Sequence, residues 1–327
     1  MNVLNFYFSK KDKSSCDNKT TPLYPNVSDT FDSQGVFSYK DDAGTIHCFD
    51  ETQIDSLVDM GINPITNKKL PKEFIGGLIS YRINQICIPI TGYYPIDKPV
   101  HCKTGWKIKE AMAEESAYGH MYTACCNSNC NFILKYQEYG PGKRGFGSYE
   151  PVTQEAIKRE VDIQNEISKL GMTIPVIDAW FCRKGGAFVM KRLKDTVRKL
   201  VLDYTNSKVL CRLVFTCMGM LYKLHELGYY HGDPHLNNFM VNYGNPDELD
   251  SDELVLYDSY EYKYYFIDFG RSGRLSSDPR KAKEQKLEDY ERLTLDLNVL
   301  KDEAGDDRRE SINMIVESLM TYYHSIK

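Results

Sequence analysis

Apolar residues recur along the chain with two different periods, and the change between them divides the sequence. Up to about residue 191, short apolar runs alternate with polar residues, which predicts strands. After Leu193 the apolar spacing becomes helical. The expected strands are Trp106–Ala113, Met121–Cys126, Asn131–Tyr136, Ile177–Cys182 and Ala187–Met190, and the expected helices are Glu155–Leu170 (closed by Gly171), Ser207–Leu227, Lys281–Leu300 and Arg308–Tyr323. The pattern therefore predicts a small β-rich half followed by a helical half.

The first hundred residues follow neither pattern for long. Residues 1 to about 40 are polar, and we expect a loose arm there. A short strand is expected at Thr45–Asp50, followed by a helix over Glu51–Met60 that Gly61 ends, and then by a turn over Asn63–Asn67. We therefore expect residues 1–100 to form an arm and a small appendage.

Composition excludes several classes of protein. A chain of 327 residues with a net charge of −5 is long enough for about two domains, and it is not a strongly basic nucleic-acid binder. No apolar run approaches the roughly 18 residues of a membrane span, and the N-terminus lacks the apolar core of a signal peptide. These features predict a cytoplasmic protein with no membrane span and no clear nucleic-acid site.

The ten cysteines also limit the function. They are neither dense nor regularly spaced, and no second ligand pair accompanies Cys125, Cys126 and Cys130, so a zinc site is not expected. We predict buried, reduced thiols.

The candidate catalytic residues are concentrated after the predicted helix Ser207–Leu227. The sequence His231-Gly-Asp233 is followed by Asn238, and Ile267-Asp268-Phe-Gly270 comes after a further strand. These segments resemble the catalytic and magnesium-binding loops of the protein-kinase superfamily. The resemblance implies that Asp233 orients the attacking hydroxyl and accepts its proton, and that Asn238 and Asp268 hold Mg²⁺ on ATP.

The same resemblance implies partners in the β-rich half. Lys135 follows Ile133 and Leu134 near the end of a predicted strand. Its position resembles that of the lysine that contacts the α- and β-phosphates in kinases. Glu160, in the next predicted helix, matches the glutamate that pairs with that lysine. Glu155 and Glu166 lie on the same helix, and Glu166 is the main rival.

Two further segments would contact ATP. Met190 matches the gatekeeper position, and the backbones of Lys191 and Leu193 would hydrogen-bond adenine. The phosphate loop would lie in Glu114–Met121, but it holds a single glycine, Gly119, and so approaches phosphates less closely.

The details resemble the atypical members of the superfamily. His235 stands where conventional Ser/Thr kinases carry lysine, as in the RIO kinases, the KEOPS-complex kinase, the UbiB-type kinases and the aminoglycoside phosphotransferases. Asp296 lies in a segment that resembles the helix bracing the catalytic loop of the KEOPS kinase. The expected fold is α+β, a bilobal kinase-like fold with the N-lobe at 101–191 and a shortened helical C-lobe at 192–327, in addition to the N-terminal appendage.

The appendage itself resembles a module found in proteins of large DNA viruses, from its Cys48-Phe-Asp and Asn63-Pro-x-Thr66 segments. A helix-turn appendage without chemistry is an equal alternative. The resemblance would place the protein in the host cytoplasm or in the virion, with a possible partner bound through this module.

The expected activity is transfer of the γ-phosphoryl group of ATP to Ser or Thr of a protein, with His235 near the transferred group. The alternatives are a small-molecule phosphotransferase of the aminoglycoside or choline kinase kind, and a pseudokinase scaffold. The acidic insert Asn245–Tyr264 is expected to be an extended, solvated hairpin.

Overall fold

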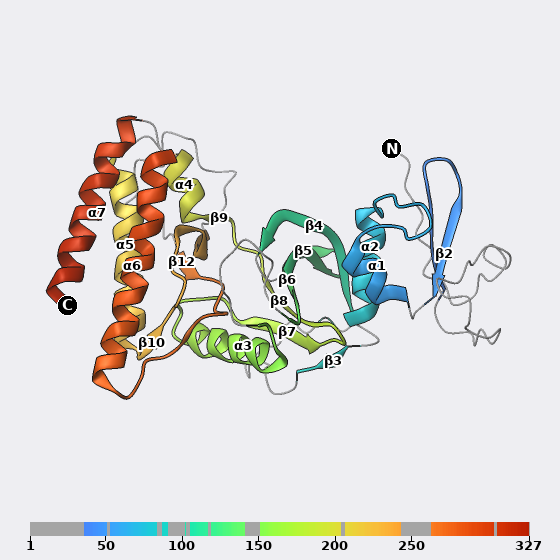
Figure 1. Ribbon diagram of the computed structural model, residues 1–327, viewed down its shortest axis with the longest axis horizontal. Coiled ribbons are helices and arrows are strands. Elements are labelled where there is room, and N and C mark those ends of the chain that lie inside the picture. The colour runs from blue at the N-terminus through green and yellow to red at the C-terminus, as the bar shows by residue number, and fades with distance from the viewer. Residues whose placement is uncertain are drawn as a thin grey trace. The chain divides into compact units, whose positions relative to one another are not determined.

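The computed structural model shows an α+β protein with seven α-helices in its described part (Figure 1). It describes residues 36–50, 53–83, 87–90, 102, 105–116, 119–140, 151–203, 207–242, 263–303 and 306–326. The chain forms two compact units. The sheet unit takes its described residues from 1–90, 100–152 and 178–189, and the helical unit takes them from 91–99, 153–177 and 190–327.

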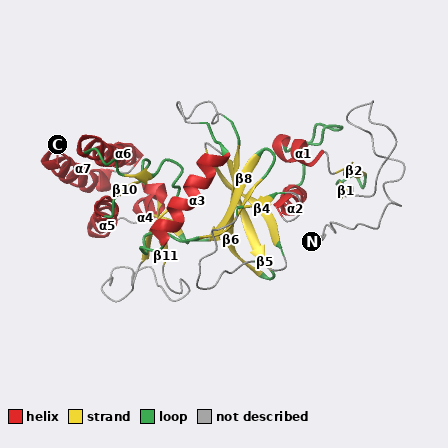
Figure 2. Cartoon of the chain, turned by 90° about the horizontal axis from the view of Figure 1, so that it is seen from below, coloured by secondary structure: helices red, strands yellow, loops and turns green. Residues whose placement is uncertain are grey.

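A six-stranded sheet forms the body of the sheet unit, in the order β3-β7-β8-β6-β5-β4 (Figure 2). Its strands β4, β5 and β6 are an antiparallel meander. Two shifts of register between β4 and β5 bend the meander, as bulges do. The strands are β3 (Ile88–Pro89), β4 (Trp106–Ser116), β5 (Gly119–Cys126), β6 (Asn129–Glu138), β7 (Val176–Phe181) and β8 (Gly185–Lys191). All five strands predicted in this region are confirmed to within three residues at each end.

The appendage packs on the same unit. Strands β1 (Val36–Lys40) and β2 (Ile46–Asp50) pair as a hairpin, and the helices α1 (Ile54–Met60) and α2 (Lys72–Tyr81) follow. Asn63 is fully buried, accepts hydrogen bonds from the amides of Ile65 and Thr66, and donates one to the Tyr39 hydroxyl. The Asn-Pro-x-Thr segment is therefore a turn that is tied to the hairpin.

Three expectations for this region need correction or completion. Residues 36–40 belong to a strand rather than to a loose arm, because they pair with β2; residues 1–35 lie outside the described residues. The first helix begins at Ile54 rather than Glu51. Helix α2 was not predicted, and it lies along β4 so closely that a Cβ on Gly76 would come 2.1 Å from the Lys109 carbonyl oxygen.

The prediction of reduced thiols is wrong for most of the described cysteines. Disulfides join Cys87 to Cys182, Cys102 to Cys126 and Cys125 to Cys130, and Cys48 is also bridged. Of the cysteines with described surroundings, the expected buried free thiol is found at Cys217. The Cys87–Cys182 bridge joins residues 95 positions apart, which spacing alone does not reveal.

The helical unit places helices around two small sheets. In one sheet β11 is the central strand between β12 and β9, and in the other β10 pairs with β13. The strands are β9 (Asp195–Thr196), β10 (Tyr229–Tyr230), β11 (Phe239–Asn242), β12 (Lys263–Phe266) and β13 (Gly273–Arg274), and the helices are α3 (Gln154–Ser168), α4 (Val197–Asp203), α5 (Ser207–Glu226), the 3₁₀ helix η4 (Leu236–Asn238), α6 (Pro279–Glu303) and α7 (Asp306–Ile326). The four predicted helices of this half are confirmed as α3, α5, α6 and α7. The predicted acidic hairpin lies outside the described residues, apart from its last two residues in β12.

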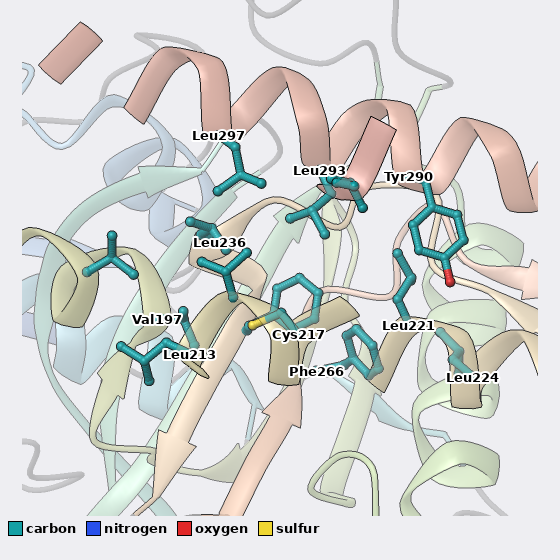
Figure 3. Close-up of a cluster of buried hydrophobic side chains, with 14 of the residues drawn as sticks. Val197, Leu213, Cys217, Leu221, Leu224, Leu236, Phe266, Tyr290, Leu293 and Leu297 are labelled. Carbon is teal, nitrogen blue, oxygen red and sulfur yellow. The ribbon is translucent and has the colours of Figure 1, made fainter. Parts of the chain in front are cut away.

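The core of this unit joins the helices to the loop that follows β10 (Figure 3). Leu236, from the start of η4, lies between the α6 side chains Leu293 and Leu297 and the α5 side chains Leu213 and Cys217. All five are buried, with at most 2% exposed. Burial of one leucine is worth about 1.5–3 kcal/mol, so Leu236 anchors this loop in the core.

None of the described helices is both long enough and apolar enough to span a membrane.

Candidate functional site

The two motif-bearing loops meet because the strands that lead to them are neighbours. Strand β11 begins at Phe239 and β12 ends at Phe266, and the antiparallel register pairs these two residues. The residues just beyond, Asn238 and Ile267, are therefore also adjacent, and the Ile267 amide donates a 3.0 Å hydrogen bond to the Asn238 carbonyl. Asp268 follows directly, so the register brings it to the same end of the sheet as Asn238.

His231 links the two loops a second time. It is fully buried, its Nε2 lies 3.1 Å from the Ile267 carbonyl oxygen, and its Nδ1 lies 3.3 Å from the Asp233 amide nitrogen. A neutral ring that carries its proton on Nε2 satisfies both contacts. Burial lowers the pKa of His231 below its ordinary value, and it outweighs the opposing effect of nearby carboxylates. His231 is thus a neutral clamp between the loops.

The Asn238 side chain is oriented by both of its amide hydrogens. Its Nδ2 donates to the Asp233 carbonyl oxygen at 2.9 Å and lies 3.1 Å from His235 Nε2. With both N–H groups engaged, the carbonyl oxygen Oδ1 is the group left to act as a ligand. His235 is therefore placed against Asn238, where it fixes the amide.

Two carboxylates of α6 hold the first of these loops from behind. Asp289 accepts hydrogen bonds from the backbone amides of His231 (2.8 Å) and Gly232 (2.7 Å). Asp296, seven residues and two helical turns later, accepts from the Leu236 amide at 2.7 Å and from Arg198 at 2.8 Å. The predicted bracing role of Asp296 is confirmed. Asp289 was not predicted, although it lies on the buried face of the same predicted helix as Asp296.

Two backbone positions show how tightly the loops are built. Gly232 has φ of +79°, and a Cβ there would lie 2.4 Å from the Arg271 carbonyl oxygen, so only glycine fits. Asp268 has φ of +61°, in the left-handed region that non-glycine residues rarely occupy. Among the described non-glycine residues, Asn67 and Asn127 also have a positive φ, and strained conformations of this kind are enriched at functional sites.

Helix α3 brings one of its glutamates to the second loop. A Cβ on Gly270 would lie 3.5 Å from Glu160 Oε2 and 3.5 Å from Asp268 Oδ1, and Glu160 is only 2% exposed. Glu166 instead accepts hydrogen bonds from the Tyr229 hydroxyl and from Arg274, both at 3.0 Å. The structure therefore brings Glu160, and not Glu166, to Asp268. Glu155 is exposed in the first turn of α3.

The other candidate residues have these surroundings. Lys135 is 5% exposed on β6, with Nζ 5.7 Å from the centre of the Phe188 ring of the same unit. Gly119 pairs with Ser116 and Gln137 inside the sheet, and a Cβ there would lie 1.8 Å from the Tyr136 carbonyl oxygen. Packing within the sheet is therefore enough to explain why position 119 is a glycine.

The segment expected to hold adenine begins with the last two residues of β8. Met190 is buried and its sulfur lies 3.6 Å from Gln164 Nε2. Lys191 is exposed at the end of β8, and Leu193 is buried.

Two arginines that sequence reasoning missed flank Asp233. Arg271 Nη1 lies 3.9 Å from Asp233 Oδ2, and Arg292 Nη1 lies 3.7 Å from Asp233 Oδ1. All three side chains are about one quarter to one third exposed. The available signals were the position of Arg271 directly after Phe269-Gly270 and that of Arg292 one helical turn after Asp289.

Among the described residues, no group of three or more His, Cys, Asp or Glu side chains is arranged to hold a metal ion. Asn238 and Asp268 together offer an amide oxygen and a carboxylate. That donor set fits Mg²⁺, which takes few protein oxygens and completes its shell with phosphates and water.

Comparison with known proteins identifies no relative, since no family model and no curated protein matches the sequence.

Proposed function

We propose that this protein is a compact, atypical protein kinase that transfers the γ-phosphoryl group of ATP to Ser or Thr of a protein. The observation that carries the proposal is the pair of loops built around Asp233, Asn238 and Asp268. The first loop is bonded to two α6 carboxylates, and the second is clamped to it through His231. Rigid placement of acidic and amide oxygens is what phosphoryl transfer requires of a protein.

Each side chain then has a definite task. The hydroxyl oxygen of the acceptor attacks the γ-phosphorus while the bond from that phosphorus to the β–γ bridging oxygen breaks, so ADP leaves. Asp233 orients the hydroxyl and accepts its proton. When bound, ATP supplies the phosphoryl group and Mg²⁺ balances the charge of the phosphates.

Asn238 Oδ1 and the Asp268 carboxylate would hold Mg²⁺. Lys135 and Glu160 would serve the phosphates as an ion pair, and Gly119 and the segment Met190–Leu193 would contact ATP. The support for this assignment is the resemblance of their segments to those of kinases, and each side chain is buried in its own unit. The two compact units differ from the predicted lobes at α3, because the helical unit contains residues 153–177, which the prediction placed in the N-lobe.

A protein acceptor is favoured over a small molecule by the use made of the helices after Gly270. Among the described residues these are α6 and α7. Helix α6 supplies Asp289 and Asp296 to the loop and Leu293 and Leu297 to the core, and α7 buries Ile312, Ile315 and Leu319. The buried side chains of both helices therefore support the loop and the core, and this use favours an acceptor site that is open rather than enclosed.

The test is incubation of the whole protein with labelled ATP and Mg²⁺, with and without Ser- and Thr-containing proteins. Wild-type protein should label them, and Asp268→Asn should lose nearly all transfer while keeping its melting temperature, because the substitution is nearly isosteric. Transfer by Asp268→Asn within about threefold of wild type, or labelling of an aminoglycoside or choline and of no protein, would refute the proposal.

A second comparison tests the ion pair. Lys135→Met should cut transfer by orders of magnitude. Glu160→Gln should be much less active than Glu166→Gln, which is the matched control on the same helix. The reverse order for the two glutamates would refute the assignment of Glu160.

A further inference from the structure

The arginines beside Asp233 are fixed in place by the fold. Arg271 lies between Phe269 and Ser272, and Ser272 donates from its hydroxyl to the His231 carbonyl oxygen at 2.6 Å and from its amide to the Phe269 carbonyl oxygen. The close approach of Gly232 to the Arg271 carbonyl sets the same backbone against the catalytic loop. The Arg271 side chain therefore starts from a rigid position next to Asp233.

Arg292 is fixed from the other side. It lies one helical turn after Asp289, whose carboxylate holds the amides of the catalytic loop. Its guanidinium also donates to Glu288 Oε1, at 2.9 Å from Nη2 and 3.3 Å from Nε. Glu288 thereby holds the guanidinium so that Nη1 is directed toward Asp233.

The distances show that neither arginine is bonded closely to Asp233. Separations of 3.7 and 3.9 Å are those of loose ion pairs, longer than the roughly 2.7–2.9 Å of a charge-assisted hydrogen bond. A loose pair leaves the carboxylate able to accept a hydrogen bond from a hydroxyl. Arg271 and Arg292 therefore lie beside Asp233 at the place where an acceptor would enter, and Glu288 is the carboxylate bonded closely to Arg292.

The segment that carries both arginines is less acidic than the chain as a whole. Residues 270–292 contain seven basic and five acidic residues, whereas the whole chain has a net charge of −5. A local excess of positive charge attracts and orients negative partners.

The geometry points to an acceptor subsite for acidic protein segments, in which Arg271 and Arg292 bind carboxylates that flank the Ser or Thr to be phosphorylated. This inference rests on the proposed function and adds its substrate class. Arginine suits the task because its planar guanidinium can bind a carboxylate through two parallel hydrogen bonds.

The test uses the full chain and three peptides with the same central serine, flanked by glutamates, by alanines or by lysines. Wild-type protein should show kcat/KM about tenfold higher for the glutamate peptide than for the alanine peptide, from two partly exposed contacts of about threefold each. The ratio should approach one at about 1 M salt, where charges are screened beyond about 3 Å.

Variants identify the residues responsible. Arg271→Gln and Arg292→Gln should each lower the preference for the glutamate peptide about threefold, mainly through KM, and Arg292→Glu should favour the lysine peptide. Arg309→Glu is the matched control, because it makes the same charge change at an exposed position of α7, and it should keep the wild-type preference. Melting temperatures confirm that each variant is folded.

The outcomes separate this inference from the proposed function. No transfer to any of the peptides or proteins would refute the kinase itself and the inference with it. Transfer to all three peptides at similar kcat/KM would refute the acidic subsite alone. An equal loss of kcat for all peptides in the arginine variants would show that they only hold Asp233. Binding of a single-stranded oligonucleotide that Arg292→Glu abolishes, without a peptide preference, would assign the arginines to nucleic acid and would overturn the inference.

Discussion

Asp289 is the residue whose replacement gives the sharpest test of how the candidate site is held. Its carboxylate is fully buried and has three partners: the His231 amide and His225 Nε2 at Oδ2, both at 2.8 Å, and the Gly232 amide at Oδ1, at 2.7 Å. Asp289→Asn keeps the shape of the side chain and replaces one acceptor oxygen with an NH₂ group. The substitution therefore changes the hydrogen bonds and the charge of the side chain while it keeps the shape.

The expected loss in the free energy of unfolding depends on which way the introduced amide is turned, and the side chain takes the more favourable of the two orientations. With its oxygen at the Oδ2 position, the asparagine side chain keeps two partners and presents N–H to the Gly232 amide. A lost hydrogen bond to a charged group costs about 1.5–3 kcal/mol, and a buried donor left unpaired costs about 1–3 kcal/mol more. We expect a loss of about 3–5 kcal/mol in the free energy of unfolding of the helical unit. That corresponds to a fall in melting temperature of roughly 10 °C for a unit of this size.

The measurement is urea or thermal unfolding followed by circular dichroism, with Glu291→Gln as the control. Glu291 is exposed on the same helix and loses the same charge in this substitution, so it should change stability by less than about 0.5 kcal/mol. A loss below about 1 kcal/mol for Asp289→Asn, or equal losses for the two variants, would refute the view that α6 holds the loop through this carboxylate.

Three other perturbations test separate parts of the fold. Gly232→Ala should cost about 2 kcal/mol or more, from the left-handed backbone and from the clash with the Arg271 carbonyl, and wild-type stability in thermal unfolding would contradict this. The pKa of His231 is lowered in the folded state, so the unfolded chain binds one more proton than the folded chain as the pH falls below about 6.5. The free energy of unfolding should therefore decline there by at most about 1.4 kcal/mol per pH unit. An equally steep decline in a His231→Gln variant would exclude His231 as the cause. Replacing both Cys87 and Cys182 with serine should cost about 4–5 kcal/mol by loop entropy, since 95 positions separate them, and an unchanged denaturation midpoint for the double variant would contradict the bridge.

Local patterns in the sequence determined much of the secondary structure and the bracing carboxylate. The helical spacing of Leu213, Cys217, Leu221 and Leu224 places these residues on one buried face of α5, and short apolar runs mark the strands β4 to β8, including β8, which is buried along most of its length. The position of Asp296 on a helix could also be predicted from its apolar neighbours. Its contact with the loop of Asp233 was predicted from the resemblance to a kinase family.

The tertiary structure decided what depends on residues distant in sequence. The disulfide between Cys87 and Cys182 forms because β3 pairs with β7 next to these two cysteines. The choice of Glu160 over Glu166 as the neighbour of Gly270 depends on which face of α3 is turned toward the second loop.

The surroundings of the Asp233 carboxylate are the strongest case of the same kind. Asp289, Arg271 and Arg292 surround the loop of Asp233 from positions 38 to 59 residues away. A hydrogen bond or an ion pair reaches only about 3–4 Å. The chain specifies such contacts only through the folding that brings the strands and α6 together, so local periodicity and composition carry no signal for them.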